Sequence, residues 1–175
     1  MEKFYLTLDP GKKGAAVLFQ GRVPIEGYVM EAQETGIDSA ALLAKLTEWD
    51  TLYSVDMVWL ECITPRPGQS AQATATQFFV LGQTVACLRL AGLTFKEVYP
   101  QTWTSFTKRL LPGFVGDSKA LQQKLAPNHF RNFAEPFRKR KLIQDGIADC
   151  LGISLWVNRD YYVDNTTEGD FKWAT

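Results

Sequence analysis

Apolar residues follow two different periods along the chain, and each period predicts one kind of secondary structure. Short apolar runs bounded by turn residues are typical of β-strands. Such runs occupy residues 3–9, 15–19, 23–30, 55–61 and 95–98. The run at 55–61 is nearly continuous, which favours a buried strand at the centre of a sheet.

Apolar residues spaced three or four positions apart predict the remaining elements, which are helices. Helices are expected at residues 38–49, 71–91, 101–110, 119–125 and 141–157. The fourth of them is expected to begin directly after Ser118, because a serine side chain can cap the first backbone N–H groups of a helix.

The order of these elements is typical of an α/β protein. Residues 9–14 contain Pro and Gly and predict a tight turn, so the first two strands should form an antiparallel hairpin at the sheet edge. The later strands alternate with helices, which favours a mixed sheet with a parallel centre and helices on both faces. The length of 175 residues suits one domain, expected over residues 1–158, followed by a polar acidic tail at 159–175.

The composition of the chain narrows the functional classes. Hydrophobic residues make up 46% and charged residues 22%, as in ordinary globular proteins. No apolar stretch reaches the length of a membrane span and no secretion signal is visible, so we expect a cytoplasmic protein without a membrane partner. Motifs for acyl transfer, P-loop hydrolysis and dinucleotide binding are missing, so no nucleotide cofactor is expected.

The net charge of zero hides an uneven distribution of charge. Residues 1–95 carry a net charge of −3, residues 96–144 of +7 and residues 145–175 of −4. The basic middle third is either an electrostatic footprint for a polyanion or the solvated face of helices. Charge alone leaves both interpretations open.

Four acidic residues lie in or beside apolar stretches: Asp9, Glu61, Asp145 and Asp149. Asp9 and Glu61 end predicted strands, and ligands collect at the carboxyl ends of strands in such sheets. Asp145 and Asp149 are four residues apart and therefore share one face of the last helix. Turn chemistry, a surface glutamate and a solvated helix face would each explain one of these features singly.

Taken together, the four acids indicate a functional site more specifically than any one of them does alone. Carboxylates removed from water need a partner charge or a metal, and four that converge would repel one another without cations between them. The pattern therefore predicts a site for Mg²⁺ or Mn²⁺ of the two-metal, phosphoryl-transfer kind.

Short motifs in a fixed order connect the chain to a known family. They occupy residues 8–14 (Leu-Asp-Pro-Gly-Lys-Lys-Gly), 60–61, 65–69, 79–83, 99–103 and 145–151 (Asp-Gly-Ile-Ala-Asp-Cys-Leu). With these motifs, most of residues 4–157 resembles the RuvC family of Holliday junction resolvases. The pattern is most similar to the RuvC-like crossover junction endodeoxyribonucleases of phages and prophages.

The resemblance implies a ribonuclease H-like fold, a homodimer, and paired symmetric nicking of four-way branched DNA. It implies two Mg²⁺ ions per active site, with Mn²⁺ as a substitute, bound by the catalytic carboxylates Asp9, Glu61, Asp145 and Asp149. It also implies a role in DNA recombination and repair in the cytoplasm of a bacterial or infected host cell.

Residues expected to contact DNA are basic and amide side chains, namely Lys12, Arg66, Gln69, Lys108, Lys119, Arg138, Lys139, Arg140 and Lys141. Bacterial members of the family place an aromatic residue where Thr64 stands, so Arg66 or Gln69 would meet the crossover instead. Lys119 matches a lysine of the family, and Lys108 would take over from another that is missing.

The helix at 71–91 is expected to form the dimer interface through Phe78, Leu81, Gly82 and Val85, where the small Gly82 permits close approach. The alternative is that this helix packs into the core of its own chain, and one helix can serve both roles.

Other functions fit parts of the same pattern. A broader branched-DNA or flap endonuclease would share the fold and the acids. A non-catalytic junction-binding protein would be expected to lose at least one acid, and all four are present. An actin-like or sugar-kinase ATPase begins with a similar turn, but that architecture needs two such domains.

Overall fold

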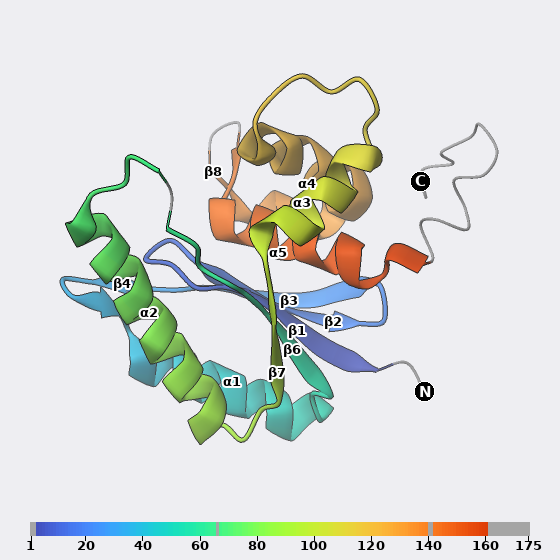
Figure 1. Ribbon diagram of the computed structural model, residues 1–175. Helices are drawn as coiled ribbons and strands as arrows, with labels where there is room; N and C mark the ends of the chain where they lie inside the picture. The colour runs from blue at the N-terminus through green and yellow to red at the C-terminus, as the bar shows by residue number, and fades with distance from the viewer. Residues whose placement is uncertain (1–2, 66, 140–141, 161–175) are drawn as a thin grey trace.

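The computed structural model describes residues 3–65, 67–139 and 142–160, and its centre is a 5-stranded mixed sheet (Figure 1). The strands are β1 (Phe4–Asp9), β2 (Ala15–Gln20), β3 (Val23–Val29), β6 (Met57–Glu61) and β7 (Phe95–Val98), in the order β3-β2-β1-β6-β7. β2 pairs antiparallel with β1 and β3, while β6 pairs parallel with β1 and β7. The expected α/β class, with an antiparallel hairpin edge and a parallel centre, is confirmed.

Helices cover both faces of the sheet (Figure 1). One face carries α1 (Ser39–Tyr53) and α2 (Ala71–Leu90), and the other carries α3 (Pro100–Arg109), α4 (Ser118–Ala134) and α5 (Asp145–Val157). Successive side chains of each strand point to opposite faces of the sheet and therefore pack alternately against one helix layer and the other. In β1, Leu6 and Leu8 join the core under α1 and α2, whereas Tyr5 joins the core under α4 and α5. Asp9 lies an even number of residues after Tyr5, so its side chain points to the same face as Tyr5 and therefore faces α5.

The turn between β1 and β2 brings the sheet and α5 into backbone contact. The Gly14 N–H donates to the Gly11 carbonyl at 2.8 Å. A Cβ at Gly14 would lie 2.2 Å from the Asp9 carbonyl oxygen, and a Cβ at Gly146 would lie 2.7 Å from the Gly14 carbonyl carbon. Only glycine fits at positions 14 and 146, so the first turn of α5 rests directly on this turn.

The last helix begins later than the sequence predicts. α5 starts at Asp145 and not at residue 141, because β9 (Leu142–Ile143) pairs antiparallel with β8 (Arg138–Lys139). The Gln144 side chain then caps the helix by accepting from the Ile147 N–H at 2.7 Å.

The preceding helix is longer than the sequence predicts. α4 extends to Ala134 rather than ending at 125, and its cap is Asp117, not Ser118, with the carboxylate accepting from the Ala120 N–H at 2.8 Å. A proline normally ends a helix. Here Pro127 lies inside α4, and the backbone leaves helical geometry only at Phe130 (φ −135°, ψ 41°).

Short elements also escaped prediction, because they contain too few residues to show a period. β4 (Ala32–Gln33) and β5 (Gly36–Ile37) form a small hairpin, and η1 (Glu135–Phe137) follows α4. Residues 161–175, most of the expected acidic tail, lie outside the described residues. None of the described helices is both long and apolar enough to cross a membrane.

We expect Gly146→Ala to destabilise the fold by about 1–3 kcal/mol, because the added methyl group would meet backbone atoms that cannot rotate away. Urea denaturation measures the change. Gly11→Ala is the matched control, since a Cβ there would have no neighbour nearer than 3.6 Å. Wild-type stability of Gly146→Ala would show that α5 does not rest on the turn.

Candidate active site

Parallel pairing of β1 with β6 brings Asp9 and Glu61 together at one end of the sheet. The register pairs Leu8 with Leu60, so Asp9 and Glu61 form the next pair at the carboxyl ends. Neighbouring strands lie roughly 4.8 Å apart. The two strands are thus neighbours, and both acidic side chains lie on the α5 face of the sheet.

α5 brings a third carboxyl group to the same place. The helix packs on the strands through Cys150, whose Sγ lies 3.4 Å from the Thr7 carbonyl oxygen and 3.3 Å from that of Ala15. Asp149, the preceding residue, is close enough to Glu61 to interact with it electrostatically. Two strands and one helix therefore contribute converging carboxyl groups.

The surroundings of Glu61 raise its pKa from 4.5 to about 9. Burial is the largest cause, followed by the negative charges of Asp9 and Asp149, and Glu61 also shares a hydrogen bond with Asp9. Without bound positive charge, Glu61 therefore holds a proton at neutral pH. At neutral pH, its ionised form requires a cation nearby.

A further contact of Glu61 was missed in the sequence analysis. The indole Nε1 of Trp103, in α3, donates to the Glu61 Oε1 at 3.2 Å, and this hydrogen bond acts to lower the pKa of Glu61. α3 begins directly after β7, the strand beside β6. The available signal was the position of this tryptophan, in the first turn of a helix that starts at the carboxyl end of a neighbouring strand.

Asp145 forms an ion pair with a lysine of α4. The Lys119 Nζ, in α4, donates to Asp145 Oδ2 at 2.5 Å, and the Gln123 Nε2 donates to Oδ1 at 3.4 Å. The ion pair is open to solvent, with 61% of the Lys119 side chain and 40% of the Asp145 side chain exposed. The hydrogen bond and charge of Asp145 raise the pKa of Lys119. The ammonium group therefore balances the negative charge of Asp145.

The donor set fits a hard divalent cation, because Mg²⁺ and Mn²⁺ prefer carboxylate oxygens. No described Lys or Arg is ion-paired with Glu61, whereas Lys119 supplies positive charge at Asp145. The side chains do not enclose an ion as they stand. Within residues 3–65, 67–139 and 142–160, no group of three or more His, Cys, Asp or Glu side chains is arranged to hold a metal.

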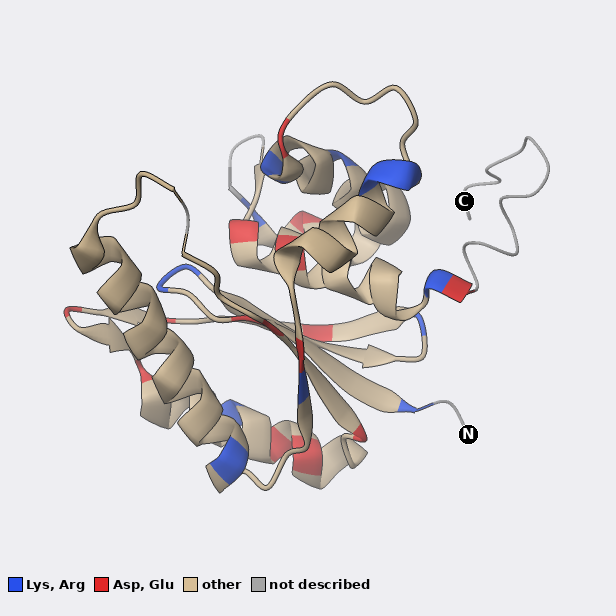
Figure 2. Ribbon diagram, in the orientation of Figure 1, with Lys and Arg blue, Asp and Glu red and all other residues tan. Residues whose placement is uncertain are grey.

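The residues expected to contact DNA occupy different surroundings. Lys12, in the β1–β2 turn, donates to the Glu34 carbonyl at 2.8 Å, and Gln69 donates to the Gln77 side chain at 2.7 Å. Lys108 is exposed on α3. Figure 2 shows the basic segments of α3 and α4 on the side of the sheet that carries α5.

The basic segment after α4 is described only in part. Arg138 forms an ion pair with Glu135 at 3.2 Å, and Lys139 belongs to β8. Arg66, Arg140 and Lys141 lie outside the described residues.

α2 presents an apolar face to solvent. Phe78 is 44% exposed, and no atom lies within 4 Å of a Cβ built at Gly82. Leu81 and Val85 instead pack partly against the core. Leu90, which the sequence analysis did not single out, is 75% exposed. α2 is thus both a core helix and a surface helix.

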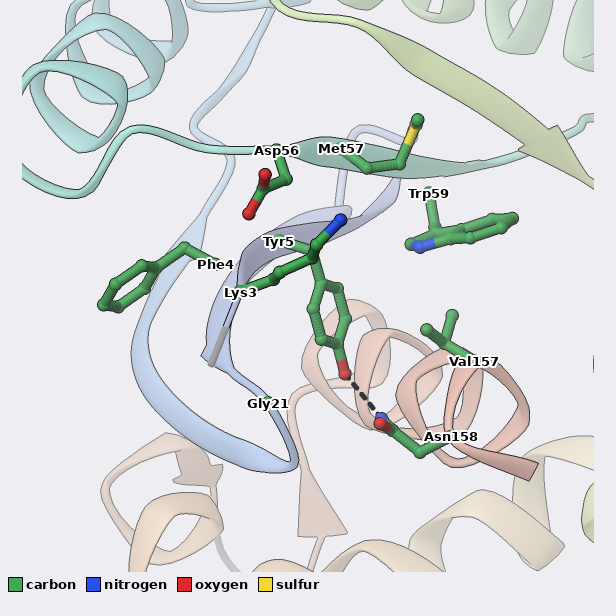
Figure 3. Close-up of a pocket in the computed structure, with 9 residues that line it drawn as sticks. All are labelled: Lys3, Phe4, Tyr5, Gly21, Asp56, Met57, Trp59, Val157 and Asn158. Atoms are coloured by element: carbon green, nitrogen blue, oxygen red, sulfur yellow. Dashed lines mark hydrogen bonds between the residues drawn. The ribbon is translucent and has the colours of Figure 1, made fainter. Parts of the chain in front are cut away.

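A cavity of about 380 Å³ lies at the opposite end of the central strands (Figure 3). Tyr5, Trp59 and Asn158 are among the residues that line it, and the Asn158 Nδ2 donates to the Tyr5 hydroxyl at 2.7 Å. Because the acids lie at the carboxyl ends of β1 and β6, this cavity is separate from the candidate active site.

Structural comparison shows similarity to resolvases. The chain is similar to RuvC of T. thermophilus in complex with a Holliday junction substrate, with a TM-score of 0.56 and 14% identity over 94% of this chain and 97% of that chain. A second structure of Thermus thermophilus RuvC gives a TM-score of 0.56 and 17% identity over the same shares. The yeast mitochondrial Holliday junction resolvase Ydc2 gives 0.60 and 12% over 93% of this chain and 80% of that one.

No family model and no curated protein matches the sequence. Identities this low show a shared fold alone. The chain has the ribonuclease H-like fold of these RuvC structures, as the sequence motifs led us to expect.

We expect the metal-free protein to lose stability as pH rises from about 5 to about 9, and Glu61→Gln to remove most of this dependence. The folded state keeps a proton on Glu61 up to a pKa of about 9, whereas the unfolded chain releases it near 4.5. The folded state therefore binds more protons in this range, and the free energy of unfolding falls as pH rises. Urea denaturation in the presence of a chelator measures it.

Glu97→Gln is the control for this pH series, because Glu97 is exposed on β7. It should keep the wild-type pH dependence. A wild-type protein whose stability stays constant across the range would contradict the assignment.

Proposed function

We propose that the chain is a metal-dependent endodeoxyribonuclease that resolves four-way DNA junctions by paired symmetric nicks. The observation that carries this proposal is the convergence of Asp9, Glu61 and Asp149; burial and the two neighbouring charges keep Glu61 protonated at neutral pH unless positive charge is bound. The similar structures are Holliday junction resolvases, one of them in complex with its junction substrate. The site and the fold support the same reaction.

The four carboxylates would hold the cations: Asp9 and Glu61 from the sheet, Asp149 and Asp145 from α5. Two Mg²⁺ or Mn²⁺ ions bound there would supply an activated water and neutralise charge on the phosphate. The residues of the chain contribute placement, since strand pairing fixes two carboxyl groups and helix packing fixes the others. Glu61 would release its proton when a cation binds.

Lys119 would couple DNA binding to completion of the acidic site. Its ion pair with Asp145 is partly exposed, so a DNA phosphate can reach the ammonium group. Movement of Lys119 from the carboxylate to a phosphate oxygen would free Asp145 for a cation. The site would then be complete only when DNA is present.

The remaining basic candidates would contact the DNA backbone. Residues 96–144 carry a net charge of +7, and Lys108 and Arg138 belong to this segment. Lys12 and the amide of Gln69 would act from the loops that follow β1 and β6. Contacts of this kind release counterions, so binding should weaken steeply as salt rises.

The enzyme would act as a homodimer through α2. Phe78 would bury its exposed ring against the second chain, while Gly82 would let the two helices approach closely. A two-fold dimer places two identical sites in the symmetric positions that paired nicks require.

The direct test is cleavage of a labelled four-way junction, beside linear duplex and a flap, with Mg²⁺, Mn²⁺ or a chelator. Asp9→Asn, Glu61→Gln and Asp149→Asn should each lower the cleavage rate by roughly two orders of magnitude or more while junction binding persists, because each removes an anionic oxygen from the site. The chelator should act in the same way.

Glu97→Gln, an exposed carboxylate near the site, is the control and should cleave like the wild type. Equal cutting of flap and junction would instead indicate a broader branched-DNA nuclease. Junction binding without cleavage in either metal would indicate a non-catalytic junction-binding protein.

Phe78→Glu should convert the dimer into a monomer and separate the two nicks, because a charge would enter the apolar interface. Sedimentation velocity measures the mass, and junction cleavage should show single nicks without paired ones. Leu52→Glu makes a similar change at a 64% exposed position on α1 and should remain dimeric. A dimeric Phe78→Glu would rule out this interface.

A further inference from the structure

We infer that Trp103 is a positioning residue for Glu61: its indole N–H holds the carboxyl group in the orientation in which it meets Asp9. This inference rests on the proposed metal-dependent function. It assigns to a buried tryptophan a role in building the cation site that packing alone would not require.

The contact joins a buried indole donor to the carboxyl oxygen that accepts from it. The Trp103 side chain is 2% exposed, and its Nε1 lies 3.2 Å from the Glu61 Oε1. An indole has a single donor and no acceptor. The Glu61 carboxyl group therefore satisfies the only polar atom of a buried ring, and in return one of its oxygens is fixed.

The tryptophan ring lies against Gly152 of α5, with the Gln122 side chain of α4 nearby. A Cβ at Gly152, in α5, would lie 2.7 Å from the Trp103 Cζ3 and 2.4 Å from the Gln122 Oε1. The Gln122 Nε2, in α4, donates in turn to the Thr107 Oγ1 at 3.0 Å, in the same helix as Trp103. Close packing fixes the position of the indole ring, so the Glu61 carboxyl group has to adopt the orientation in which it can accept this hydrogen bond.

A second tryptophan–glutamate pair in the chain shows what a purely structural pair contains. The Trp49 Nε1 donates to Glu26 Oε2 at 2.8 Å, and the Lys45 Nζ lies 3.1 Å from Glu26 Oε1. That pair carries its own cation. The Trp103–Glu61 pair has no ion-paired Lys or Arg among the described residues and faces other carboxyl groups instead.

The lack of an ion-paired cation at the described Trp103–Glu61 pair indicates what the indole contributes. A glutamate that must accept an external cation has to be held without an internal one, and a neutral donor does this. Partners that orient metal-binding carboxylates typically change metal affinity about 10- to 100-fold when removed. Trp103 supplies such a bond without adding charge that would compete with the cation.

The test compares two Trp→Phe variants of the full chain by calorimetric titration with Mn²⁺ and Mg²⁺. Trp103→Phe keeps an aromatic ring but loses the N–H, and it should bind Mn²⁺ about tenfold more weakly than the wild type. Trp49→Phe is the matched control, since it loses the same kind of hydrogen bond at Glu26. It should bind Mn²⁺ like the wild type, whatever its stability.

A spectroscopic measurement separates positioning from packing. In ¹⁵N–¹H spectra of the wild-type protein, the Trp103 indole resonance should shift when Mg²⁺ is added, and the Trp49 resonance should not. This measurement needs no variant, so it holds even if Trp103→Phe fails to fold. Gly152→Ala, which would displace the ring, should also weaken Mn²⁺ binding.

The outcomes are distinct. Wild-type metal affinity in Trp103→Phe, or an indole resonance that Mg²⁺ does not move, would overturn the inference while leaving the proposed nuclease intact. A wild-type protein that binds neither Mn²⁺ nor Mg²⁺ would overturn the proposed function and the inference with it.

Discussion

The parallel pairing of β1 with β6 is the contact on which the site depends. The two strands are separated in sequence by four short strands, β2 to β5, and by α1, and only their pairing makes Asp9 and Glu61 neighbours. The pairing also sends both acids to the same face, because Leu8 and Leu60 occupy the other one. A shift of one residue in this register would turn Glu61 toward α1 and α2 and remove it from the site.

The fold balances its partly buried carboxyl groups in two ways. The negative charge of Glu26 is balanced within the chain by Lys45, so this carboxylate needs no external cation. Glu61 has no ion-paired Lys or Arg among the described residues, and without a bound cation it is protonated at neutral pH. Asp145 lies between these cases, since its lysine is exposed and replaceable. The three cases differ in how much of the balancing positive charge the chain itself supplies.

The sequence indicated much of the sheet and the four acids, because strands, turns and lone carboxylates in apolar stretches leave local signals. The parallel centre followed from the alternation of strands with helices. The beginning of α5 could not be predicted, since the two-residue strand at Leu142–Ile143 depends on a partner strand and not on its own pattern. Trp103 was missed for the same reason: its hydrogen bond to Glu61 spans 42 positions and becomes visible only after β6 and β7 have paired.

The contact between Gly14 and Gly146 has a consequence for how such a protein can change over time. Neither backbone segment can retreat, because one closes a hairpin and the other begins the helix that carries two of the acids. Larger residues at either position would have to be matched by a change in the length of the turn or in the seating of the helix. Variation at these two positions should therefore be coupled, since this steric contact, rather than the acids themselves, sets the spacing between the acids of the sheet and those of α5.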